Sequence, residues 1–361
     1  MQPSGHGRLS SRGPNVGDDW PVTRATGIGS LPGTHSREAI ISVRDILLDA
    51  DGLGIPYLPE LPSRGPGSDI IGRAAGLLVD MPVDLQPSGW RLVDHPGRDA
   101  RRTASLWTED LDEAAAAYDG YVGELKVQVA GPWTLASSLE LNRGERVLTD
   151  EGATRDLVDS LAEGVKRHLA TVHRLIPGAT LILQVDEPSL PAVLEGSLPT
   201  ASGYGRVRAV DRQVVAGGLR AVLDVAAGPT VVHCCHDRVP IPLLRNVAPG
   251  AIALDVTSAS PARWESLATA LEAGIGVYAG CLPTAPGSPP ATAGSVRKVA
   301  HGIRDGLERA GLGADSLAQL TITPACGLAA LTPKGAHDVH RMAIDVAREL
   351  SEHDEGPTHE H

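Results

Sequence analysis

One short segment holds several residue types that bind metals. The run TVVHCCHDR, at positions 230–238, places two histidines and two cysteines side by side at the end of an apolar stretch. Side chains of an extended segment alternate, so His233 and Cys235 point to the same side. A further thiol, Cys326, follows a later apolar run. One imidazole and two thiolates with an open fourth position are typical of a catalytic zinc site.

The charge of this ligand set favours sulfur chemistry. Two thiolates and a neutral imidazole cancel the 2+ charge of zinc, which leaves a mild Lewis acid that can still hold a substrate thiol as its thiolate. Cysteine is also among the most buried residue types, so Cys234 or Cys235 could instead pack in the core. The sequence leaves open which of the two faces the metal, although alternation favours Cys235. His236 has the character of a loop histidine.

The elements that must position these residues alternate between strand and helix. The candidate strands are mostly continuous Val, Ile and Leu runs, as in a parallel sheet buried on both faces. They lie at 25–30, 54–60, 125–131, 181–187, 230–235, 251–256, 275–280 and 320–325. Apolar residues at three- and four-residue spacing predict helices at 35–50, 154–176, 210–226, 261–273, 292–310 and 335–351.

This alternation predicts an α/β fold, a (β/α)8 TIM barrel. Residues 23–351 would form the single barrel domain, with flexible tails at 1–22 and 352–361. The segment 282–292 is expected to be an extended loop. A long excursion separates Glu60 from Leu125, and the crossover between the fifth and sixth strands is short.

Polar and thiol side chains recur where the predicted strands end. In a barrel these carboxyl ends converge on one face, which carries the active site. The residues concerned are Ser30, Glu60, Asp186, His233, Cys235, Asp255, Cys281 and Cys326. The sequence therefore predicts one shared cavity for residues spread over three hundred positions.

Composition excludes several classes of protein. The 361 residues contain 32 Lys and Arg against 44 Asp and Glu, so no basic surface for nucleic acid is expected. No apolar run approaches membrane-spanning length, and the polar, Gly-rich start has no signal-peptide pattern. The four cysteines are expected to be reduced thiols in a cytoplasmic protein. Phe is absent, so Val, Leu, Ile and Ala must build the core.

Several motifs together resemble one family. The stretches TGIGSLPGT (26–34), VQVAGPWTLASSL (127–139), LQVDEPSL (183–190), the HCC run and TPACGL (323–328) are similar to the catalytic barrel of cobalamin-independent methionine synthase. They occur in the family's order from about residue 24 to 350. The resemblance implies a (β/α)8 barrel in which zinc activates homocysteine for methylation to methionine, within a broader group that includes uroporphyrinogen decarboxylase.

The resemblance also implies a ligand set and an amino-acid subsite. The zinc histidine and two cysteines of the family fall on His233, Cys235 and Cys326, and its acidic ligand on the shorter Asp255. The carboxylate of the DEP motif, which binds the substrate amino group, matches Asp186. Two further expected substrate-binding residues are Ser30, for the substrate carboxylate, and Glu60, for the ammonium group.

The chain departs from the family on the side of the methyl donor. Ser138 stands where the family has a Trp that stacks on folate, and Ala192 replaces an acidic residue implicated in pterin binding. The proton-handling Asp and His of the family align with Ala279 and Cys281. The resemblance gives Asp186 and Cys281 as the expected catalytic residues, and the family's large N-terminal half, which helps hold folate, is expected to be absent.

The sequence therefore predicts a zinc-dependent S-methyltransferase that methylates homocysteine or a related thiol, as in methionine biosynthesis. Methyltetrahydrofolate is the family's donor, whereas a methylated corrinoid protein fits the missing Trp better. One alternative is a metal-free decarboxylase of the uroporphyrinogen type, with Arg64 and Arg73 facing an acidic ligand. The other is a non-catalytic barrel with structural zinc that binds a thiol or a protein partner.

Overall fold

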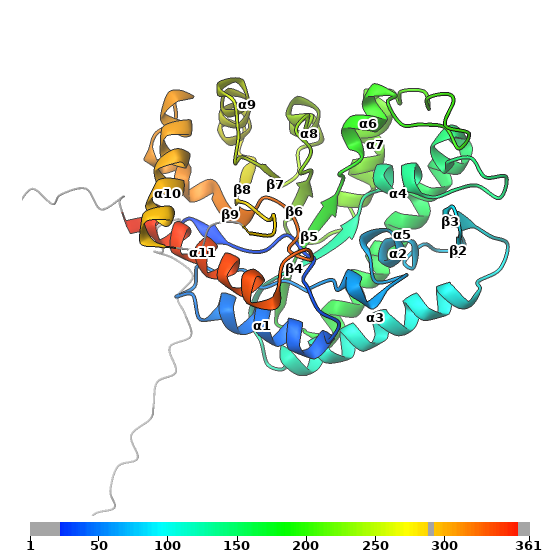
Figure 1. Ribbon diagram of the computed structural model, residues 1–361, viewed down its shortest axis with the longest axis horizontal. Helices are drawn as coiled ribbons and strands as arrows, with labels where there is room; N and C mark the ends of the chain where they lie inside the picture. The colour runs from blue at the N-terminus through cyan, green and yellow to red at the C-terminus, as the bar shows by residue number, and fades with distance from the viewer. Residues whose placement is uncertain (1–21, 288–291, 353–361) are drawn as a thin grey trace, which may run out of the picture.

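The chain forms a parallel α/β barrel, which confirms the predicted fold. The computed structural model describes residues 22–287 and 292–352 (Figure 1). Seven parallel strands form one curled sheet in the order β1-β9-β8-β7-β6-β5-β4. Their bounds are β1 Arg24–Ala25, β4 Gly123–Ala130, β5 Ala179–Asp186, β6 Thr230–His233, β7 Ala251–Asp255, β8 Gly276–Leu282 and β9 Leu320–Pro324. The predicted tails lie outside the described residues, apart from Val22 and Glu352.

The predicted strand at 54–60 is present as an irregular stave that joins β1 to β4. Three isolated parallel bridges hold it: Ala25 to Gly54, Ser30 to Glu60 and Tyr57 to Lys126. Pro56 and Pro59 have no N–H to donate, so the segment cannot make a continuous ladder. The stave nevertheless contacts both edge strands of the sheet and so closes the barrel.

Helices surround the strands, as Figure 1 shows. Each of the six predicted helices is found, with bounds α1 Ser36–Leu48, α5 Glu151–Leu175, α7 Arg212–Leu223, α9 Pro261–Glu272, α10 Ala293–Arg309 and α11 Pro333–Glu352. The short helices that follow β4, β5 and β6 were not predicted: α4 Pro132–Ser138, α6 Leu190–Glu195 and α8 Ile241–Val247. The last of these makes the short crossover after the fifth stave of the barrel. No helix in the described ranges is long and apolar enough to cross a membrane.

The excursion after Glu60 folds against the barrel rather than away from it. It contains a 3-10 turn η1 (Pro62–Arg64), α2 (Ile70–Ala75), an antiparallel hairpin of β2 (Val83–Gln86) and β3 (Gly89–Leu92), and the long helix α3 (Arg98–Ala117). The helix α3 packs on α1 along one side of the molecule (Figure 1). Its buried face carries Thr103, Trp107, Asp110 and Ala114, at three- and four-residue spacing.

Two apolar cores flank the barrel wall. The larger lies between the sheet and the helices and is built mainly of Leu, Val, Ile and Ala. The smaller core consists of Ile55, Ile182, Val231, Ala251, Ala253 and Tyr278. Side chains alternate along each strand, so Lys126 and Gln128 share one face of β4, and Gln184 and Asp186 share the same face of β5 as Ile182. Polar groups on this inner face lie toward the carboxyl ends of the strands.

Candidate metal and amino-acid site

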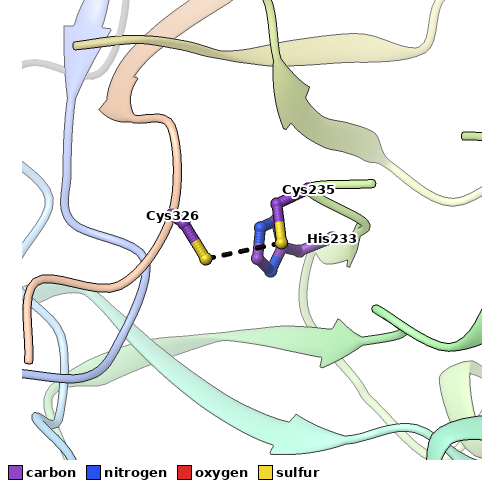
Figure 2. A group of neighbouring side chains, drawn as sticks. All are labelled: His233, Cys235 and Cys326. Carbon is purple, nitrogen blue, oxygen red and sulfur yellow. Dashed lines mark hydrogen bonds between the residues drawn. The ribbon is translucent and has the colours of Figure 1, made fainter. Parts of the chain in front are cut away.

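The predicted metal ligands converge at the carboxyl ends of β6 and β9. His233 is the last residue of β6, Cys235 follows it, and Cys326 lies just after β9. Their side chains approach one another in Figure 2, and their ligand atoms all lie within 4.8 Å of each other. A hydrogen bond joins the Sγ atoms of Cys235 and Cys326, which are 3.4 Å apart. Two segments separated by about ninety residues thus supply one compact group.

The orientation of His233 suits metal binding. Its Nδ1 is 2.8 Å from Oδ1 of Asp186, so the carboxylate fixes the ring and leaves Nε2 as the free nitrogen. That Nε2 is buried and has no hydrogen-bond partner in the described protein. A buried nitrogen without a partner is costly unless it binds something else. A nitrogen and two sulfurs are the ligand types that zinc prefers, so these residues fit a zinc ion.

The cysteines differ in their surroundings. The hydrogen bond to Cys235 lowers the pKa of Cys326 to about 6, and the nearby His233 adds to this effect. Burial raises the pKa of Cys234 to about 12. Cys234 is fully buried, whereas Cys235 and Cys326 are both half-buried. Cys235, not Cys234, therefore lies beside Cys326 in the ligand group, as strand alternation predicts.

Asp255, the fourth ligand implied by the resemblance, lies at the end of β7. Within the described residues, the group of metal-binding side chains does not include it. Its Oδ1 accepts hydrogen bonds from the backbone N–H of Thr257 at 2.7 Å and from the hydroxyl of the same residue at 2.6 Å. This local turn occupies one carboxylate oxygen, and ligation of the metal by Asp255 stays a prediction.

His236 is a loop residue, as the sequence indicates. The backbone N–H of Arg238 donates to its Nδ1.

Ser30 and Glu60, which the resemblance implies as substrate-binding residues, are neighbours in the structure. Ser30 and Glu60 form a parallel bridge, in which Glu60 N–H donates to Gly29 O and Leu31 N–H donates to Glu60 O. The backbone O of Ser30 also accepts from Leu328 N–H at 2.8 Å, next to the Cys326 loop. A Cβ on Gly327 would lie 2.0 Å from Ser30 Oγ, so any other residue here would force that hydroxyl to move.

Two glutamines on the inner face were not singled out by sequence. Gln128 on β4 and Gln184 on β5 are register partners, and both are buried. The Nε2 of Gln128 donates to Leu58 O at 2.6 Å, and that of Gln184 donates to Ile28 O at 2.9 Å and to Asp186 Oδ1 at 2.7 Å. Because each amide nitrogen must donate to these oxygen atoms, the orientation of both side-chain amides is fixed. Each Oε1 is consequently buried without a partner.

Buried ionisable groups lie near these two glutamines on the inner face of the barrel. Burial raises the pKa of Glu60 to about 7, although Arg73, Lys126 and a hydrogen bond from Gln128 oppose the effect. Burial lowers the pKa of Lys126 to about 7, against the influence of Asp186 and Glu60. Lys126 Nζ donates to the carbonyl of Ile28 at 2.9 Å. The interior thus holds a surplus of acceptor atoms, which a ligand with a charged amino group would satisfy.

The second carboxylate of the DEP motif, Glu187, was also missed. It is fully buried and accepts hydrogen bonds from Trp133 N–H, Thr134 N–H and Thr134 Oγ1 at the start of α4. A Cβ on Gly131 would lie 2.3 Å from Glu187 Oε1, which explains the glycine in the GPWT stretch. Burial raises the pKa of Glu187 to about 7. Its position next to Asp186 was the available signal.

The positions that the resemblance links to the methyl donor carry few reactive side chains. Ser138 is the last residue of α4, and Ala192 lies in α6. Ala279 and Cys281, on β8, both belong to the larger apolar core. Burial raises the pKa of the Cys281 thiol to about 12. This placement gives no support to a catalytic role for Cys281, which stays a prediction from the alignment alone.

The two arginines that a tetrapyrrole decarboxylase would need are engaged elsewhere. Arg64 Nη1 lies 2.5 Å from Asp110 Oδ1, and Arg73 Nη1 lies 2.5 Å from Asp110 Oδ2. Both guanidinium groups are buried against this carboxylate on α3. Their charge is therefore compensated within the protein and is not free for an acidic ligand.

Comparisons with known proteins agree with this geometry. Residues 22–349 match the family model described as cobalamin-independent synthase, catalytic domain. A B12-independent methionine synthase from Shewanella sp. W3-18-1, solved in complex with selenomethionine, shares the fold. It superposes with a TM-score of 0.62 at 14% identity, covering 92% of this chain and 98% of that one.

Two other solved structures match with lower similarity. A Bacteroidetes-affiliated GH5 cellulase matches with a TM-score of 0.37 at 10% identity, covering 92% of this chain and 95% of that one. The carboxyl transferase domain of Rhizobium etli pyruvate carboxylase matches with 0.26 at 9%, covering 94% and 55%. No curated protein sequence matched significantly.

Proposed function

Because the chain belongs to the family of cobalamin-independent synthase catalytic domains, we propose that it is a zinc-dependent S-methyltransferase acting on homocysteine or a related amino thiol. The observation that carries this proposal is the unpartnered, buried Nε2 of His233 beside two sulfurs 3.4 Å apart. A metal with a position left open for a substrate thiol satisfies all three atoms.

The protein's own residues prepare the metal site. His233, Cys235 and Cys326 would hold the ion, which when bound would lower the pKa of a substrate thiol. Asp186 Oδ1 accepts a hydrogen bond from His233 Nδ1–H and so fixes both the ring and its tautomer. In this proposal Asp255 stands outside the ligand set, because the group of three side chains whose ligand atoms lie together does not include it.

The acceptor surplus of the interior supports a substrate with an ammonium group. Asp186 Oδ2 has no hydrogen bond from the described protein, and Oε1 of Gln128 and of Gln184 are buried without partners. Together with Glu60 these atoms would accept the three N–H groups of an α-ammonium. Ser30, beside Glu60, would bind the substrate carboxylate through its hydroxyl and nearby backbone. The selenomethionine complex of the Shewanella enzyme supports an amino-acid ligand of this kind.

Catalysis would then consist mainly of positioning. The substrate sulfur forms a bond to the methyl carbon, while the bond from that carbon to the donor breaks and its electron pair leaves with the donor. Holding the thiol and donor in line contributes by proximity. We propose a methylated corrinoid as donor rather than methyltetrahydrofolate, because Ser138 and Ala192 replace the residues that the resemblance links to the pterin.

The first experiment measures metal content and thiol binding. One zinc per chain is expected, and cobalt-substituted protein should develop a sulfur-to-cobalt charge-transfer band when homocysteine is added. Methyl transfer is then assayed with methylcobalamin and with methyltetrahydrofolate, and the cobalamin donor should be faster.

Two outcomes would contradict the proposal. Protein without metal, in which all four thiols react freely, would exclude a zinc enzyme. A cobalt spectrum that homocysteine leaves unchanged would indicate a closed structural site.

A further inference from the structure

Glu60 is approached by a guanidinium group from outside the barrel. Arg73, on α2, has its Nε 3.9 Å from Glu60 Oε1, and both side chains are almost completely buried. That Nε–H has no hydrogen-bond partner in the described structure. The other groups that act on Glu60 are Lys126 and Gln128 from β4 and Asp186 from β5. Arg73 is therefore the cation that the excursion contributes to this carboxylate.

Arg73 is itself held tightly by α3. Its Nη1 is 2.5 Å from Asp110 Oδ2, and its guanidinium carbon lies 3.7 Å from the centroid of the Trp107 ring. The indole Nε1–H of Trp107 donates to the backbone O of Arg73 at 3.1 Å. Ser36 on α1 donates to the other oxygen of Asp110. Three contacts from α3 thus hold Arg73, and Ser36 of α1 in turn holds Asp110, so the position of the guanidinium group relative to Glu60 is fixed.

The electrostatic consequence concerns the charge on Glu60. Desolvation favours the neutral carboxylic acid, and Arg73 provides the largest opposing influence on its pKa. A protonated Glu60 would lose its attraction for an ammonium group. Loss of the Arg73 charge would therefore weaken binding of amino thiols and leave thiols without an amino group unaffected.

We propose that Arg73, clamped by Asp110 and Trp107, is a positioning residue that acts through Glu60 by favouring its ionised form, and so makes the site selective for thiols with an α-ammonium group. This inference rests on the proposed function. It assigns to the excursion between β1 and β4 a role in substrate selection, through a residue that does not touch the substrate itself.

The test compares the binding of homocysteine with that of 4-sulfanylbutanoate, the same thiol without its amino group. Calorimetry on zinc-loaded protein gives both dissociation constants between about pH 6 and pH 8, and their ratio removes the pH dependence of thiol binding itself. Wild type should prefer homocysteine, with a preference that grows as pH rises through about 7, where Glu60 ionises.

In Arg73→Gln this preference should fall about fivefold near pH 7, since a rise of about one unit in the pKa of Glu60 lowers its ionised fraction there from about one half to about one tenth. Its rise should also move to higher pH, and Arg73→Lys should recover part of it. Arg64→Gln is the matched control, because Arg64 binds the same Asp110 carboxylate and has no contact with Glu60. The control should keep the wild-type preference.

The possible results separate the two proposals. A wild-type protein that binds neither thiol overturns the proposed function and this inference with it. An unchanged preference in Arg73→Gln, or an equal loss in Arg64→Gln, overturns this inference alone. If Arg73→Gln does not fold, Asp110→Asn releases Arg73 without removing it, and a preference equal to that of Arg64→Gln overturns the inference.

Discussion

Asp186 and Glu187 are adjacent buried carboxylates that serve two different sides of the barrel mouth. Asp186 faces inward and holds His233, beside Cys235 and Cys326, and we call these four residues the metal side. Glu187 faces α4 and receives three hydrogen bonds from its first turn. We call Glu187, together with Ser138, Ala192, Ala279 and Cys281, where the resemblance to the family expects donor-handling residues, the donor side.

The difference lies in unsatisfied atoms. Next to the metal side, His233 Nε2, Gln128 Oε1 and Gln184 Oε1 are buried without partners, which indicates a ligand still to be bound. On the donor side Glu187 is fully satisfied, and the replaced positions carry small or apolar groups. From this comparison we expect that, in this protein, binding of the proposed amino thiol and binding of the proposed donor can be changed separately.

Removal of a thiolate should have the largest effect on the metal side. Cys326→Ser is expected to lose stoichiometric zinc and the homocysteine-dependent cobalt band, because only two ligands of the group remain. Metal analysis after gel filtration measures this. Cys234→Ala is the control, since this buried neighbour of Cys235 lies outside the group and should keep its zinc. Equal zinc content in both variants would show that Cys326 is not a ligand of the metal.

The carboxylate behind the histidine should matter less. Asp186→Asn keeps the shape but weakens the hold on His233 Nδ1, and a change of this kind typically lowers metal affinity about 10- to 100-fold. Competition with a chromogenic chelator gives the affinity. A wild-type value in this variant would mean that the carboxylate–histidine contact has no part in binding the metal.

Glu187 offers a test of stability on the donor side. Its pKa is raised from 4.5 to about 7 in the folded protein, so the folded state binds the proton more tightly than the unfolded state. Stability from this group is present at low pH and is lost as pH rises from 4.5 to 7.

Glu187→Gln removes this dependence. Between about pH 5 and pH 7, the wild-type free energy of unfolding should fall relative to the variant by about 1–2 kcal/mol. Urea unfolding of both metal-free proteins measures the difference, in which the other titrating groups cancel. A constant difference across this range would show that the carboxyl stays ionised in its site.

An aromatic ring introduced at position 138 should strengthen binding of a folate donor by a small amount. Ser138→Trp replaces the residue that stands where the family carries its folate-stacking Trp, and a stacked ring contributes about 1 kcal/mol. We expect roughly fivefold tighter binding of methyltetrahydrofolate, measured by calorimetry, and unchanged homocysteine binding. Weaker homocysteine binding would show that the two sides are coupled.

The smallest effect is expected at Asp255. Because its Oδ1 already accepts two hydrogen bonds from Thr257, Asp255→Asn should retain one zinc per chain with nearly wild-type affinity. The chelator competition used for Asp186→Asn also decides this case. A loss of zinc as large as that in Cys326→Ser would show that Asp255, at the end of β7, is a ligand of the metal.

The sequence predicted what depends on local pattern and on strand ends. Continuous apolar runs gave the staves, and the rule that strand ends converge brought His233 and Cys326 together before any contact was known. The Arg73–Asp110 contact could not be predicted in this way, because it joins two helices of an excursion without a known topology. Asp110 lies on the same face as Trp107 and Ala114, yet a lone carboxylate on a helix normally faces solvent. Its burial follows from two arginines that arrive from elsewhere.

The two prolines in the stave at 54–60 have a consequence for the order in which the barrel opens. The β4–β5 ladder runs over eight residue pairs, whereas the stave is attached by isolated bridges. Amide hydrogens of the stave and of β1 should therefore exchange with deuterated solvent well before those of β4 and β5. Glu60 ends this stave. The part of the barrel that is expected to open first is therefore also the part that carries the carboxylate proposed to bind the substrate amine.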